Sequence, residues 1–116
     1  MGTKEIAEKF TAALKAGQFA EAESLWSDDV ASVEAMDGPM KDIRGRANVH
    51  AKGEWWNANH DVHSFEAFGP YVNGDQFTLR FKIDVTAKAD GKRMQMEEVG
   101  LYTVRGDRIA EERFFY

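Results

Sequence analysis

The chain has 116 residues, a formal net charge of −5 and no cysteine. This length suits a single domain, expected to span residues 1–116, and the missing cysteines exclude disulfides, thiolate catalysis and cysteine-based zinc sites. Because the basic residues are interleaved with acids, the composition argues against nucleic acid as a partner. No apolar run is long enough to cross a bilayer and no signal peptide is visible, so we expect a cytoplasmic location and no membrane partner.

The first half of the chain predicts three helices and one strand. Apolar residues from Ile6 to Leu14 recur at helical spacing after a Thr3 cap and stop at Gly17, which predicts an amphipathic helix. A second short helix is predicted with an apolar side from Phe19 to Trp26. A strand over residues 30–36 and a third helix over residues 46–59 follow.

Four strands are predicted in the second half, over residues 62–72, 76–88, 93–105 and 108–116. The dipeptides between them are Asn73-Gly74, Asp90-Gly91 and Gly106-Asp107, which are typical of tight hairpin turns. Two helices, a strand, a helix and an antiparallel meander form an α+β order, in which helices fold onto one face of a curved sheet.

Two-residue turns would also set the register of the meander. They place His63 opposite Asp84, Asp84 beside Glu97, and Leu101 beside Glu112. One face then mixes charged and apolar side chains: His63, Arg80, Lys82, Asp84, Glu97, Glu112 and Tyr116 among Phe65, Val99, Leu101 and Phe114. The other face carries an apolar stripe from Phe77 to Val85. A single β-bulge would reverse part of this assignment.

The element order, the Ile43-Arg44-Gly45-Arg46 entry to the third helix and the ending from Gly106 to Tyr116 resemble the SnoaL-like branch of the nuclear-transport-factor-2-like superfamily. The resemblance implies a cone-shaped α+β barrel with three N-terminal helices on a mainly antiparallel sheet. The superfamily includes polyketide cyclases, ketosteroid isomerase, limonene epoxide hydrolase, scytalone dehydratase and members that only bind ligands or partners. Fold alone therefore does not choose a chemistry.

Two arguments disagree about which sheet face the helices cover. Apolar content alone would turn the stripe from Phe77 to Val85 inward, against the helices. The resemblance instead places pocket residues at Asp84, Glu112, Phe114 and Tyr116, on the mixed face. We take the mixed face as the predicted pocket. The exposed stripe would then need a partner, and a homodimer packed sheet to sheet would bury it.

In that pocket His63 and Asp84 would be base and orienter, and Glu97 an acid sharing a proton with Asp84. Arg80 or Lys82 would hold an anionic oxygen. The other predicted ligand-contacting residues are Phe65, Val99, Leu101, Glu112, Phe114, Tyr116 and Trp56. Trp55 would point to another side of the same helix. Glu98 is the alternative acid if a bulge reverses the parity.

The family pattern is incomplete, because Lys82 replaces the Arg of the epoxide hydrolase Arg-x-Asp motif and Phe114 replaces its second Asp. The predicted function is a cofactor-independent acid/base enzyme of the isomerase, cyclase or hydratase type. Its ligand would be a small hydrophobic carbonyl or ring-oxygen compound. A non-catalytic binding or dimerisation module, with the charges as a cross-strand ladder, is the alternative. We expect no metal, because His60 and His63 have no further ligand nearby.

Overall fold

The computed structural model describes residues 2–116. Its helices are α1 (Thr3–Lys15), α2 (Phe19–Glu23) and α3 (Arg46–Asn59). Its strands are β1 (Trp26–Val33), β2 (Asp42–Arg44), β3 (His60–Asn73), β4 (Gln76–Ala87), β5 (Arg93–Arg105) and β6 (Arg108–Phe115). The observed order matches the predicted one except for β2, which the sequence pattern did not indicate.

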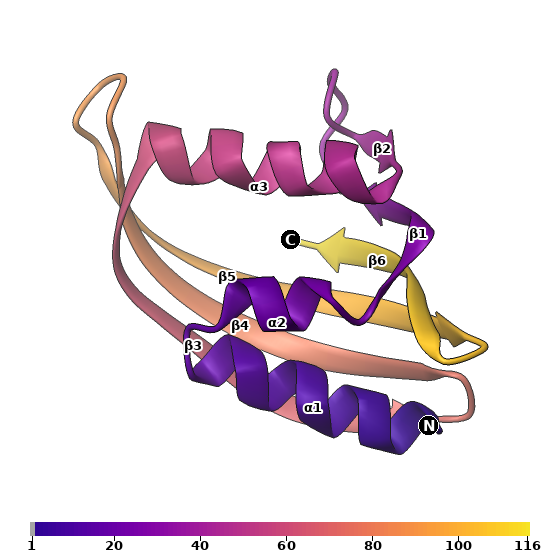
Figure 1. The fold of residues 1–116 in the computed structure, drawn as a ribbon. Coiled ribbons are helices and arrows are strands. Elements are labelled where there is room, and N and C mark those ends of the chain that lie inside the picture. Colours follow the sequence, from indigo (N-terminus) through magenta and orange to yellow (C-terminus); the bar gives the residue numbers. More distant parts are fainter. Residues whose placement is uncertain (1) are drawn as a thin grey trace.

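The strands form one mixed sheet with the order β2-β1-β6-β5-β4-β3. Strands β1 and β6 run parallel, and the other neighbours are antiparallel. The long strands curve, and the three helices lie on the concave side (Figure 1). This confirms the predicted α+β class and the helix-covered curved sheet.

Helix α1 closes the core on that side. Ile6, Phe10 and Ala13 are buried, and the Phe10 ring centroid lies 4.9 Å from that of Tyr102. The predicted Thr3 cap is wrong, because Gly2 is the N-cap and Thr3 already lies in the helix.

The second helix is shorter than predicted. It ends at Glu23, and Trp26 already belongs to β1, where it pairs with Ile109 of β6. The Ile109 amide donates a hydrogen bond to the Leu25 carbonyl at 2.8 Å. Pairing with a strand more than eighty residues away is invisible to local periodicity, so the helical pattern was extended too far.

The helices cover the apolar stripe, so the predicted orientation of the sheet is wrong. Phe77, Leu79, Phe81, Ile83 and Val85 are all buried in the core. Burying five such side chains favours this orientation by about 10 kcal/mol, which outweighs the family analogy. The reason for expecting a homodimer is thereby lost, and dimerisation itself stays a prediction.

The register between β5 and β6 also differs from the prediction. Glu112 pairs with Tyr102 rather than Leu101, because the register shifts between Thr103 and Val104. A shift of one residue turns every later side chain to the other face. Glu112 and Phe114 therefore belong to the concave side.

Two irregularities in β3 change its predicted pairs. The register shifts between Val62 and Ser64 and again between Phe68 and Tyr71. Ser64, and not His63, therefore lies opposite Asp84, and Phe65 lies opposite Ile83 on the concave side.

The connection between β4 and β5 is longer than two residues, since the Gly91 amide bonds the Ala87 carbonyl at 2.9 Å. Asp84 consequently faces Gln95 instead of Glu97. A shift of two residues leaves the faces unchanged, so Asp84 and Glu97 still share the convex side.

Candidate functional site

A hydrogen-bonded set of charged side chains lies on the concave side of the sheet. The Ser32 hydroxyl donates to Glu112 Oε2 at 2.7 Å, and Lys52 Nζ donates to Ser32 Oγ and to Glu34 Oε2, both at 2.8 Å. The Tyr116 hydroxyl donates to Glu34 Oε1 at 3.1 Å. We call Ser32, Glu34, Lys52, Glu112 and Tyr116 the buried network after Glu112 at its centre, which is only 9% exposed, whereas Tyr116 at its edge is 51% exposed.

Three elements bring this network together. Ser32 lies in β1 directly beside Glu112 of β6, because these two strands pair in parallel. Lys52 lies on α3, three residues after the buried Val49 and four before Trp56, so it shares their inward side. The network therefore depends on contacts between β1, α3 and β6, which are distant in sequence.

Two carboxyl groups of this region have perturbed acidities. Burial raises the pKa of Glu112 to about 7, although Ser32 and Lys52 oppose the shift. Burial, reinforced by the charge of Glu34, raises the pKa of Glu98 to about 7. Groups that titrate near neutral pH can both accept and donate a proton, as acid/base catalysis requires.

Glu98 reaches the same side from β5. It lies opposite Phe81, a buried core residue, and makes no hydrogen bond with any residue in the range 2–116. The sequence predicted Glu98 as the alternative acid if a bulge turned it to the pocket side. The observed register shift lies between β5 and β6 and turns Glu112, whereas Glu98 faces the concave side because the helices cover that side of the sheet.

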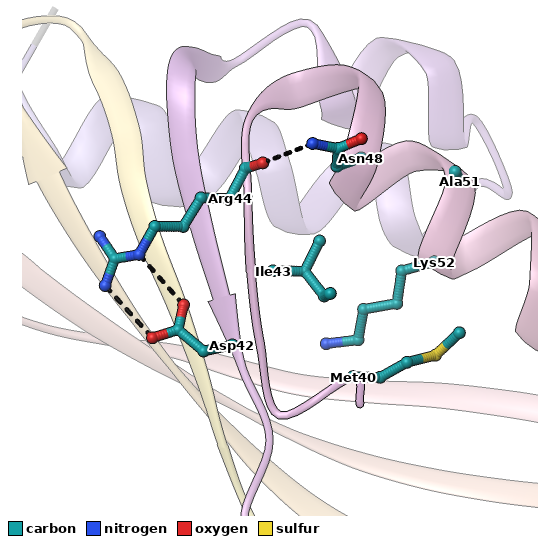
Figure 2. Close-up of a pocket in the computed structure, with 7 residues that line it drawn as sticks. All are labelled: Met40, Asp42, Ile43, Arg44, Asn48, Ala51 and Lys52. Carbon is teal, nitrogen blue, oxygen red and sulfur yellow. Dashed lines mark hydrogen bonds and ion pairs between the residues drawn. The ribbon is translucent and has the colours of Figure 1, made fainter. Parts of the chain in front are cut away.

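An open surface hollow of about 410 Å³ adjoins the network at Lys52. Figure 2 shows the Lys52 side chain between Ile43 and Met40, with Asn48 and Ala51 of α3 on the same wall. The rest of the lining is Asp42 and Arg44, whose side chains pair at 3.1 Å. Lys52 thus lies both at the edge of this surface hollow and in the buried network.

Aromatic side chains surround the charged groups. Lys52 Nζ lies 5.8 Å from the centroid of the Phe114 ring, close enough for a cation–π contact. The Trp56 ring stacks on His60 at 4.3 Å and packs against the core, whereas Trp55 is exposed. The two side chains therefore point to different sides of α3, as predicted from their spacing.

The predicted catalytic set lies on the convex side, where its members have other partners. Arg93 donates two hydrogen bonds to Asp84, at 3.0 and 2.8 Å. These bonds hold the pKa of Asp84 below its usual value, so the predicted proton shared between Asp84 and Glu97 is wrong. His63 is exposed, and its Nε2 lies 2.7 Å from Thr86 Oγ1.

The remaining predicted residues divide between the two sides. Arg80 pairs with Glu97 at 2.9 Å, and its guanidinium lies over the Phe68 ring. Lys82, Asp84 and Glu97 line an open groove of about 440 Å³ on this convex side, where Val99 and Leu101 also lie. The concave side receives the other five: Trp56, Phe65, Glu112, Phe114 and Tyr116.

Three residues of the buried network were not predicted. Ser32 and Glu34 continue an alternation with the buried Val30, and Lys52 follows Val49 at helical spacing. The spacing of these residues is visible in the sequence. Each is nevertheless indistinguishable from an ordinary polar residue until the partner strand or helix is known. Only their meeting with Glu112 makes them a site.

Within residues 2–116, no three or more His, Cys, Asp or Glu side chains are grouped so that they could hold a metal ion. None of the helices in that range is long and apolar enough to cross a membrane.

Comparisons with known proteins agree on the fold. A family model described as the SnoaL-like domain matches residues 1–116. A proposed SnoaL-like polyketide cyclase from Mesorhizobium loti is 54% identical, with a TM-score of 0.96 and 100% coverage of both chains. No curated protein matches the sequence.

Two more distant structures show the fold alone. A Catenulispora acidiphila protein with a ketosteroid isomerase-like fold, solved with trimethylamine, is 21% identical, with a TM-score of 0.76 over 98% of this chain and 86% of its own. A nuclear-transport-factor-2-like protein from Burkholderia thailandensis is 15% identical, with a TM-score of 0.85 over 99% and 90%.

Proposed function

Because this chain belongs to the SnoaL-like domain family, we propose that it binds a small hydrophobic molecule on the concave side and transforms it by cofactor-independent acid/base chemistry. The observation that carries this proposal is the pair of carboxyl groups, Glu98 and Glu112, that titrate near pH 7 beside Lys52. The ligand would carry a carbonyl or ring oxygen. Isomerisation, cyclisation and hydration all need such a proton exchange.

Glu98 is the proposed general base. Its carboxylate has no hydrogen bond to the described residues, so it is free to take a proton from a carbon next to the ligand's carbonyl group. The electron pair of the broken C–H bond would move toward the carbonyl oxygen as an enolate. Return of the proton from Glu98 to a different carbon would complete an isomerisation.

Lys52 is the proposed partner of the developing negative oxygen. Its ammonium has three N–H donors, of which two are used by Ser32 and Glu34. The third N–H can donate to the ligand oxygen. A charged donor in a partly buried site stabilises an enolate strongly. Glu112, held by Ser32, supplies a second exchangeable proton in the same region.

Apolar surface for the ligand lies next to these groups. Met40, Ile43 and Ala51 line the open surface hollow that Lys52 shares, and Phe114 and Trp56 flank the network. This supports a largely hydrophobic ligand with one polar end.

The test is a ligand screen followed by turnover assays. Small enones, epoxides, polyketide-like phenols and steroids are screened by thermal shift, and stabilising compounds are then assayed with wild type, Glu98→Gln, Glu112→Gln and Glu97→Gln. Glu97 and Glu98 are neighbours that face opposite sides of the sheet, which makes their amides a matched pair. We expect Glu98→Gln to lower turnover at least about 100-fold, the usual contribution of a general base.

The opposite pattern would reject this assignment. Loss of turnover in Glu97→Gln, with Glu98→Gln fully active, would return the chemistry to the convex groove predicted from sequence. Binding without turnover in every variant and in wild type would favour the non-catalytic binding module.

A further inference from the structure

Tyr102 of β5 is a largely buried aromatic residue of the concave side. Its side chain is 2% exposed, yet its hydroxyl makes no hydrogen bond with any residue from 2 to 116. Among the side-chain polar atoms of residues 2–116, the indole Nε1 of Trp26 is the one that is fully buried without a partner, so the Tyr102 hydroxyl keeps contact with solvent. A ligand oxygen can therefore reach this hydroxyl and accept its hydrogen bond.

The position of the hydroxyl is set by Gly100. A Cβ at Gly100 would lie 2.9 Å from both the Tyr102 hydroxyl oxygen and its Cε2, so the phenol ring lies flat across this glycine. The hydroxyl is thereby displaced along β5 from Tyr102 toward Glu98. Gly100 lies between Leu79 of β4 and Phe114 of β6, which flank the hydroxyl with apolar side chains.

The ring is held rigidly in this place. It stacks on Phe77 with a centroid distance of 4.9 Å and an interplanar angle of 12°, and Phe10 contacts it at 4.9 Å. The Phe114 ring meets it edge-on at 6.5 Å. Donors that are fixed before the ligand arrives lose little entropy on binding and are therefore effective.

The charges around Tyr102 define which ligand its hydroxyl suits. Burial and the negative charges of Glu112 and Glu98 raise the pKa of Tyr102 well above its ordinary value. The phenol consequently stays protonated and acts as a donor. With Glu34 nearby, three carboxyl groups face one lysine, so an anionic ligand would be repelled and an uncharged acceptor preferred.

We infer that the Tyr102 hydroxyl donates a hydrogen bond to an uncharged carbonyl or ether oxygen of the bound ligand. Gly100, which has no Cβ, leaves the room in which the Tyr102 ring lies in this position. The inference rests on the proposed function for the location of the ligand, but it concerns binding and not proton transfer. It adds a specific oxygen-binding residue that the acid/base assignment does not need.

The experiment compares Tyr102→Phe with wild type, using probes that differ in one oxygen. The probes are 2-cyclohexenone, cyclohexene oxide and, without oxygen, 1-methylcyclohexene. Tyr71→Phe is the matched protein control, because Tyr71 is 65% exposed. Binding is measured by thermal shift and calorimetry, and the carbonyl stretching frequency of bound cyclohexenone is recorded by infrared difference spectroscopy.

We expect Tyr102→Phe to bind the two oxygen-bearing probes roughly 3- to 10-fold more weakly, the contribution of one net hydrogen bond. 1-Methylcyclohexene should bind both proteins equally, and the carbonyl frequency should rise in the variant. Without a probe, the melting temperature of Tyr102→Phe should equal or exceed that of wild type, because a hydroxyl without a partner is removed.

Three results would overturn the inference. One is a lower melting temperature of probe-free Tyr102→Phe, since that reveals a structural partner. Another is equal affinity of both proteins for the oxygen-bearing probes, and the third is no binding of these probes to wild type. Failure of the proposed function would give a different result. The oxygen-bearing probes would still bind more weakly to Tyr102→Phe than to wild type, but Glu98→Gln would leave turnover unchanged or no turnover would occur.

Discussion

The two sides of the sheet carry similar residue types in different environments. Glu97 and Glu98 are adjacent in β5, yet Glu97 pairs with Arg80 at the exposed convex surface while Glu98 lies on the concave side with a raised pKa. On the convex side Arg93 pairs with Asp84 and lowers its pKa, and Arg80 pairs with Glu97. On the concave side burial outweighs the single lysine. Acid/base reactivity therefore depends on how many charges the fold buries together, and not on how many the sequence contains.

The largest difference between the two sides is expected in packing. Phe81→Ala removes a buried ring from the concave core and should lower the free energy of unfolding by about 3–5 kcal/mol. Leu101→Ala, on the convex side and only partly buried, should cost less than half as much. Urea denaturation of both variants measures this, and equal losses would mean that both faces are covered in solution, as in a sheet-to-sheet dimer.

Removal of Lys52 should have the next largest effect. Lys52→Met leaves Glu34 and Glu112 without their cation, and breaking a pair this well buried should cost on the order of 3 kcal/mol at pH 8. The loss should shrink at pH 5.5, where Glu112 is protonated. Chemical denaturation at both pH values is the measurement, with the exposed Lys41→Met as control. A loss independent of pH would argue that Lys52 acts through packing alone.

The pH dependence of stability should report the ionisation of Glu112. Its pKa is about 7 in the folded protein and near 4.5 when unfolded, so between these values the folded state binds more protons. Wild-type stability should therefore fall as the pH rises from about 4.5 to 7. Glu112→Gln abolishes this penalty.

Accordingly, Glu112→Gln should be more stable than wild type by on the order of 2 kcal/mol at pH 8, and no more stable at pH 4.5. Thermal or urea unfolding across this range provides the measurement. A variant that is less stable than wild type at pH 8 would show that the Ser32 and Lys52 contacts outweigh the burial of the charge.

The smallest effect is expected for Asp84→Asn. The Arg93 bonds lower the pKa of Asp84, so its contribution is present above the unfolded pKa and is lost as the pH falls through the folded one. Because the pair lies at the surface, its loss should change stability only slightly at pH 7 and not at all near pH 2. A urea titration at pH 7 checks this. A gain in stability would instead revive the strained acid pair predicted from sequence.

Local pattern was enough for much of the fold. The bounds of α3 and β5 agree with those predicted from helical spacing and hairpin turns, and the amphipathic pattern of α1 is confirmed by its buried Ile6 and Phe10. The α+β class followed from the order of these elements. The resemblance to the SnoaL-like family, which the family model confirms, also rested on the Ile43-Arg44-Gly45-Arg46 segment and on the ending from Gly106 to Tyr116. The helices and strands depend on residues that are close in sequence, whose spacing is visible in one sequence.

The site was only half predictable. Trp56, Glu112, Phe114 and Tyr116 were named, and Glu98 was the alternative acid, but the catalytic roles were placed on His63, Asp84 and Glu97. Turn dipeptides set register only where no residue is inserted, and β3 and β6 both violate that condition.

The sequence by itself thus determined most of the elements and the acidic residues available, because these follow from short-range periodicity and composition, while the family was indicated by resemblance. Tertiary structure alone decided which carboxyl groups are buried with a raised pKa. The parallel pairing of β1 with β6 joins Ser32 to Glu112, and the shift between Thr103 and Val104 turns Glu112 inward toward Lys52. A side chain in a strand changes face with a shift of one residue, and such a shift is set by long-range pairing that no local pattern records.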